Sequence, residues 1–272
     1  MCFTRVLNKR DNRGRHLLVI VWGLCFVSLL ACTASVPIGS QATPTVRTAS
    51  GLRETIMPQP NKPTPAGDWN RRWLQHVPCE APCFEGVTPG NTTIDQATQV
   101  WQFSPIIGKL SIWQLDHPIL GNTIEIAANW LDESDHGAIN ALAIPVDQQV
   151  IIAMRVTHDH SITIGDVLNA YGQPSHIEAT GFRDPDGVPN YFLAIEYVNH
   201  GFVISERFGK QKPHLNDALL FSRLTLFTQT DIGKKAAGSL AGISNRSRAW
   251  EGMKDFAYYC TDDEGGAICN RP

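Results

Sequence analysis

Cysteine side chains are the first groups in this sequence whose type and spacing could support chemistry. Cys79 and Cys83 form one close pair, and Cys260 and Cys269 form a second. A redox pair usually has two residues between its cysteines at the start of a helix, whereas Cys79 and Cys83 have three residues between them. Irregular spacing also disfavours a zinc site built from all four cysteines. We therefore expect four structural cysteines.

Of the seven cysteines, Cys2, Cys25 and Cys32 lie in or directly after an N-terminal stretch that resembles an export signal, which leaves four. An even number of cysteines in an exported chain predicts disulfide bonds. Four cysteines allow three connectivities, which sequence alone does not separate. Prolines near the first pair and glycines near the second give bent, loop-like segments, so we favour Cys79 with Cys83 and Cys260 with Cys269. Cross pairing would join the two ends of the domain.

Histidine and aspartate residues offer two weaker metal motifs. His158, Asp159 and His160 could bind a transition metal, but short polar residues between a strand and a helix also form a turn, which we favour. Asp184 and Asp186 resemble part of a calcium loop without its closing glutamate, and a β-turn is the simpler interpretation. We predict neither a metal site nor a cofactor.

Motifs for catalysis are missing from the sequence. It has no Gly-x-Ser-x-Gly, Ser-x-x-Lys or His-Glu-x-x-His pattern and no glycine-rich phosphate loop, so we predict no enzyme activity and no catalytic residues.

Tryptophan residues suggest an alternative function. Exposed indole rings can bind carbohydrates or other small ligands, so the protein could be a ligand-binding lipoprotein. We expect most of them in the core. Five of the seven lie in the first part of the chain: Trp69, Trp73, Trp101, Trp113 and Trp130.

The chain begins like an export signal. Five basic residues precede an apolar run at 17–31, which is shorter than the roughly 20 residues of a membrane-spanning helix. The run ends in Leu29-Leu30-Ala31-Cys32, which resembles the lipobox of bacterial lipoproteins. The resemblance implies that 1–31 is removed, that Cys32 is lipidated, and that the protein is anchored to a cell membrane or outer membrane. An ordinary signal peptide or an uncleaved anchor is the alternative.

The segment 32–68 reads as a disordered linker. It contains many prolines and threonines but no aromatic residue, so it cannot bury enough apolar surface to fold. The whole chain has 23 basic and 26 acidic residues, and removal of the signal would make it more acidic. An acidic chain is a poor partner for nucleic acid. We expect a tethered domain outside the cytoplasm that binds no nucleic acid.

Two similar stretches suggest tandem units. "TIDQATQVW" at 93–101 matches "TIGDVLNAY" at 163–171 in residue type at most positions. In each, a threonine precedes a glutamine or aspartate by three residues, the capping-box pattern of a helix start. We expect the first helix to end before Pro105 and the second at Gly172.

Alternating apolar residues follow each predicted helix. They predict strands at 109–115, 123–131, 139–146 and 150–157, and again at 176–182, 191–198, 202–208 and 219–228. The expected fold class is therefore α+β, with two tandem units of short helix plus antiparallel sheet at 69–158 and 159–272. We expect 231–248, which is rich in small residues, to be mobile, and a short helix at 250–257.

The second stretch, "TIGDVLNAYGQP", resembles the helix-opening signature of SmpA/OmlA-type outer-membrane assembly lipoproteins and of the β-lactamase-inhibitor-protein-like fold. The resemblance implies a domain that binds other proteins through its sheet or loops. The expected function is that of a non-enzymatic envelope lipoprotein with an envelope protein as partner.

Overall fold

The computed structural model describes residues 55–56, 69–130, 138–143, 149–244, 246–262 and 268–269. All of them belong to one unit of the chain, Thr48–Pro272. Cys32 and the predicted signal at 1–31 lie outside the described residues, and of the predicted linker only Thr55 and Ile56 are described. In the described part, no helix is long and apolar enough to span a bilayer.

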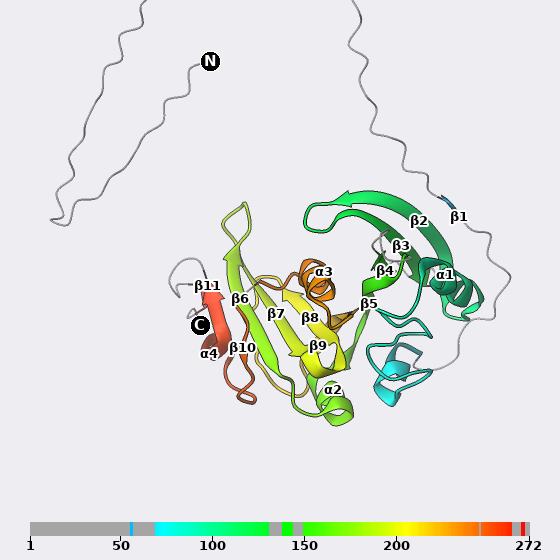
Figure 1. Cartoon of the computed structure of the whole chain (residues 1–272). Coiled ribbons are helices and arrows are strands. Elements are labelled where there is room, and N and C mark those ends of the chain that lie inside the picture. The colour runs from blue at the N-terminus through cyan, green and yellow to red at the C-terminus, as the bar shows by residue number, and fades with distance from the viewer. Residues whose placement is uncertain are drawn as a thin grey trace, which may run out of the picture. The chain divides into compact units, whose positions relative to one another are not determined.

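Eleven strands join in one sheet (Figure 1). Their order is β1-β2-β3-β4-β5-β9-β8-β7-β6-β10, and β11 also pairs with β6. The β11–β6 pair is parallel and every other pair is antiparallel. The strands are β1 (Thr55–Ile56), β2 (Ile107–His117), β3 (Gly121–Trp130), β4 (Ala138–Ala143), β5 (Ile151–Thr163), β6 (His176–Arg183), β7 (Pro189–Tyr197), β8 (Phe202–Phe208), β9 (Leu220–Phe227), β10 (Arg248–Ala249) and β11 (Cys260–Asp262).

The helices are short. The α-helices are α1 (Ile94–Phe103), α2 (Ile164–Tyr171), α3 (Asp231–Ala241) and α4 (Phe256–Tyr259), and the 3-10 helices are η1 (Trp69–Gln75) and η2 (Val198–His200).

The expected fold of two tandem helix-plus-sheet units is wrong. Met154 on β5 lies opposite Leu226 on β9, and this antiparallel pairing merges strands from both halves of the chain into a single mixed sheet. Separate sheets would each have left a long edge strand with unpaired backbone groups. The expected boundary between 158 and 159 falls inside β5.

Local signals placed the first two helices correctly. The Thr93 hydroxyl accepts a hydrogen bond from the Gln96 backbone, and the Gln96 side chain accepts one from the Thr93 backbone. Thr163 and Asp166 repeat the same reciprocal bonds at α2. These side chains satisfy amides that have no partner at a helix start. Both capping boxes predicted from sequence are confirmed.

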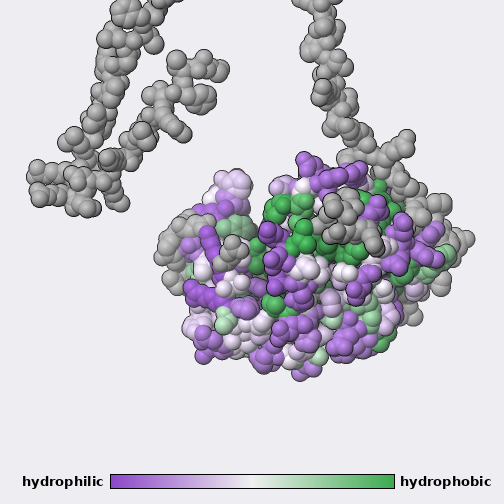
Figure 2. Space-filling model, in the orientation of Figure 1, coloured by the Kyte–Doolittle hydropathy of each residue, from purple (hydrophilic) through white to green (hydrophobic). Residues whose placement is uncertain are grey.

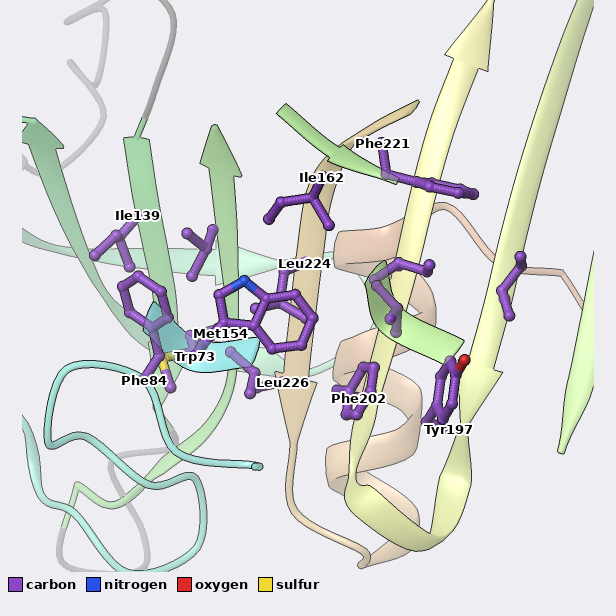
Figure 3. Packing of buried hydrophobic residues seen from close by; sticks show 14 of the residues in the cluster. Trp73, Phe84, Ile139, Met154, Ile162, Tyr197, Phe202, Phe221, Leu224 and Leu226 are labelled. Carbon is purple, nitrogen blue, oxygen red and sulfur yellow. The ribbon is translucent and has the colours of Figure 1, made fainter. Parts of the chain in front are cut away.

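Two apolar clusters lie on opposite faces of the sheet. Alternate residues of β7 show the division, because Leu193 and Ile195 belong to the main core and Phe192 and Ala194 to the second cluster. The main core receives residues from η1, α1 and α2. Figure 3 shows part of it, including Phe202, whose ring stacks on Tyr197 with 4.6 Å between centroids.

Helix α3 covers the second cluster and contacts β5, β8 and β9 (Figure 1). Our expectation that 231–248 would be mobile was therefore wrong for its first part. The expected helix at 250–257 was also misplaced, because the structure has a helix there only from Phe256.

Candidate binding groove

A groove of about 800 Å³ lies between α3 and the sheet. We call it the α3 groove and define it by the residues that line it. They come from the β2–β3 turn, from β7, η2 and β8, from the end of β9, and from α3 and the segment after it: Ile119, Glu196, Val198, Val203, Phe227, Lys234, Lys235, Ala237, Gly238, Ser239, Ile243, Ser244 and Ser247.

The sequence of α3 places it close to the sheet. Thr230 caps the helix by accepting a hydrogen bond from the Gly233 backbone at 3.2 Å. Ala236, Ala237 and Ala241 face the second cluster and are nearly fully buried, and these small side chains permit a close approach. At Gly233 a Cβ atom would lie 2.3 Å from the Thr228 carbonyl oxygen, so only glycine fits there.

Apolar residues form the floor of the groove. Val203 on β8 and Phe227 on β9 are 2% and 4% exposed and belong to the second cluster. Ile119, in the turn between β2 and β3, is 59% exposed although it is large and apolar. Figure 2 shows hydrophobic residues gathered over the β2–β3 region beside α3. The floor thus continues the second cluster outward to a surface that water can reach.

The β2–β3 turn is tied to α3 by a polar contact. The His117 Nε2 atom lies 3.2 Å from the Ser239 hydroxyl, within hydrogen-bond distance. His117 Nδ1 also accepts hydrogen bonds from the backbone amides of Ile119 and Leu120. These contacts set the position of Ile119 at the groove.

The segment after α3 is held down by a buried carboxylate. Glu178 on β6 is 2% exposed and accepts hydrogen bonds from the Ser244 backbone at 2.9 Å and the Ser244 hydroxyl at 2.8 Å. Burial raises the pKa of Glu178, and the hydrogen bonds from Ser244 limit that rise. Since Ser244 also lines the groove, Glu178 fixes one part of its wall.

Three charged side chains line the groove without a partner of opposite charge. Lys234 and Lys235 are exposed, and neither forms an ion pair with any residue that the structure describes. One carboxylate oxygen of Glu196, Oε1, is buried and has no hydrogen-bond partner among those residues. The groove therefore offers two exposed positive charges beside apolar side chains.

A row of residues on adjacent strands leads from the groove to Arg155 beneath α3. On adjacent strands, Glu196 lies opposite Val203, Val203 opposite Thr225, and Thr225 opposite Arg155. The Arg155 guanidinium donates hydrogen bonds to the Leu240 carbonyl near the end of α3, at 3.3 Å, and to a side chain on β4. Arg155 thereby attaches the last turn of α3 to the sheet.

The predicted disulfides lie away from the groove. Cys79 pairs with Cys83 and Cys260 with Cys269, as favoured from sequence. The second pair joins β11 to the segment that carries Ile268, and a Cβ atom at Gly181 on β6 would lie 2.7 Å from that side chain. Neither pair lines the groove.

The residues of the two possible metal motifs, at 158–160 and at 184 and 186, do not line the groove either. His158 is 5% exposed and lies within β5, so the expected turn at this position is wrong. The side chains of Asp159 and His160 lie outside the described residues. Asp184 is in a turn between β6 and β7, where its carboxylate accepts from the backbone amides of Asp186 and Val188, which confirms the predicted β-turn. Among described side chains, no group of three or more metal-ligating residues forms a cluster.

Most described tryptophans are core residues, as expected. Trp73, Trp101 and Trp130 are at most 4% exposed. Trp113 and Trp250 are half-buried, and the Trp69 side chain lies outside the described residues. The Trp250 indole donates a hydrogen bond to a glutamine side chain at 2.6 Å, and its ring stacks on that of Tyr259.

Sequence reasoning missed the groove because α3 was not predicted. Gly233, Gly238 and Ser239 weaken the helix signal. The signal that could have found it is Thr230 as N-cap, followed by alanines at helical spacing up to Gly242, which takes the left-handed conformation that ends a helix.

No family model, curated protein or solved structure matches the chain. The likeness to lipoprotein signals and to SmpA/OmlA-type proteins therefore stays a prediction. The residues that line the groove are charged, polar and apolar side chains of α3, the sheet and the β2–β3 turn.

Proposed function

We propose that this protein is a non-enzymatic envelope lipoprotein that docks a segment of a partner protein in the α3 groove. In this proposal Cys32 carries the lipid anchor, 32–68 is the tether, and the folded part presents the groove outside the cytoplasm. The single observation that carries the proposal is the open groove over an apolar floor.

The size and composition of the groove support docking. Binding sites for small ligands commonly measure about 300–1,000 Å³, and a groove of about 800 Å³ is in that range. A protein interface typically has an apolar centre and a polar rim. Val203 and Phe227 supply the centre, and the lysines and serines of α3 and its following segment supply the rim. A docked segment would remove Ile119 from water.

Site-specific photocrosslinking tests the proposal. A photoreactive amino acid replaces Ser247, which lines the groove, in the full-length chain expressed in bacterial cells. The same residue at Gly209, where a Cβ atom would meet no atom within 4 Å, is the control. We expect a defined crosslinked protein from the first position and not from the second. Equal capture from both positions, or capture from neither, would contradict the proposal.

A second candidate function is carbohydrate or small-ligand binding by exposed aromatic residues. It rests on Trp250, which is half-buried, and on Tyr258 in the same C-terminal region, which is 47% exposed. Exposed aromatic faces can stack on sugars or cations. Titration of glycans into the protein would shift Trp emission under this alternative. The shift should disappear in Trp250→Ala and persist in a variant whose α3 groove is blocked.

A further inference from the structure

We propose that the segment bound in the α3 groove is an extended, acidic and apolar peptide. Its carboxylates face Lys234 and Lys235, and its apolar side chains cover Ile119, Val198 and Ile243. This inference rests on the proposed function and names the chemistry of the partner.

The lysines are placed to bind carboxylates. Lys234 lies one helical turn before Gly238, and Lys235 lies one turn before Ser239. Each lysine is therefore on the same side of α3 as another residue that lines the groove. Asp231, one turn earlier on the helix, forms an ion pair with neither. In a chain with more acidic than basic residues, two adjacent lysines without a described carboxylate partner mark a local site for negative charge.

Accessible apolar side chains set a second requirement. Ile119 is 59% exposed, and Val198 and Ile243, which also line the groove, are half-buried. An occupant with apolar side chains would remove this surface from water.

These requirements separate a peptide from other anionic ligands. A phosphate or sulfate ion would suit the lysines, but it would leave Ile119 exposed. A fatty acid has an apolar chain but a single carboxylate for two lysines. An extended peptide supplies several carboxylates and apolar side chains from one chain.

The test uses three short fluorescein-labelled peptides and the purified full-length protein in detergent. The peptides share the same leucine and valine positions and carry glutamate, glutamine or lysine at every other position. Fluorescence anisotropy gives the affinity of each. We expect the glutamate peptide to bind about tenfold more tightly than the glutamine peptide, and the lysine peptide to bind most weakly. Added salt should reduce the preference for glutamate, because it screens exposed charges.

Variants assign the preference to residues. Lys234→Gln with Lys235→Gln should remove the preference for glutamate, whereas Lys210→Gln, in the β8–β9 connection, should retain it. Ile119→Ser removes the exposed apolar side chain and should weaken binding of every peptide.

Equal binding of the three peptides, binding of none, or an unchanged preference in the double lysine variant would overturn the inference. A labelled fatty acid that binds and is not displaced by the glutamate peptide would overturn it too. Failure of this inference is distinguishable from failure of the proposed function. If the three peptides bind equally but Gly238→Phe prevents the binding of all three, the result would contradict acidic specificity and would still support docking in the α3 groove.

Discussion

Glu178 on β6 and Ser244 after α3 are joined by hydrogen bonds of 2.9 Å from the Ser244 backbone and 2.8 Å from its hydroxyl. The two residues are far apart in sequence, and the contact fixes the segment after α3 on the sheet. Ser244 lines both the α3 groove and a second cavity of about 160 Å³ that includes Glu178. The Glu178 carboxylate therefore holds in place a residue that borders both the α3 groove and the second cavity.

The Glu178 carboxylate gives a pH prediction. Burial raises its pKa in the folded protein, so its favourable contribution is complete below the unfolded pKa and declines as pH rises through the folded pKa. Glu178→Gln does not ionise. The variant should gain stability relative to the wild type as pH rises above the ordinary glutamate pKa of about 4, as measured by urea unfolding at a series of pH values. A stability difference that does not change with pH would contradict this account.

Thr163 gives a capping prediction. Thr163→Ala removes the hydroxyl that accepts from the Asp166 backbone at 3.1 Å and should reduce the free energy of unfolding by about 1 kcal/mol. Thr163→Ser keeps a hydroxyl and is the matched control. Equal stability of the alanine and serine variants in chemical denaturation would show that the cap contributes nothing.

Two glycines of α3 should respond oppositely to alanine. At Gly238 the nearest atom to an added Cβ is the Ile243 carbonyl oxygen at 3.7 Å, so Gly238→Ala should stabilise the protein by about 1 kcal/mol. At Gly233 the added atom would lie 2.3 Å from the Thr228 carbonyl oxygen, so Gly233→Ala should destabilise it by about 1–3 kcal/mol. Thermal unfolding of both variants checks the pair, and a shift of the same sign in both would contradict the placement of α3.

The C-terminal disulfide should contribute more to stability than the first. Replacement of Cys260 and Cys269 by serine should cost about 2–3 kcal/mol, because their sequence separation is 9 against 4 for Cys79 and Cys83, and longer closed loops restrict the unfolded chain more. Denaturant unfolding of the two double variants compares them. A larger loss from the first pair would contradict the prediction.

Short-range signals in the sequence predicted local structure well. The capping threonines Thr93 and Thr163 mark the starts of α1 and α2, and alternating apolar residues predicted the main strands of the sheet. The pairing of Met154 with Leu226 was not predictable, because it joins strands distant in sequence and depends on the whole core. The same holds for Glu178 and Ser244, since no local pattern shows which buried acid will meet which loop.

The α3 groove was the main feature that could not be predicted from the sequence. Gly238 and Ser239 resemble loop residues when read alone, and α3 is stabilised there by small side chains that fit against β5, β8 and β9. Lys234 and Lys235 belong to α3, so their place in the groove could not be predicted without this helix. The predicted anchor at Cys32 lies outside the described residues, so it remains a prediction.

The most direct measurement of the central claim is photocrosslinking from position 247 in two further variants. Gly238→Phe places a ring in the groove at a site where the backbone accepts a Cβ atom, and Gly238→Ala leaves most of the groove open. We predict that the crosslinked partner is retained with alanine and lost with phenylalanine, while both proteins remain folded by circular dichroism. Equal capture by the two variants would contradict docking in the α3 groove.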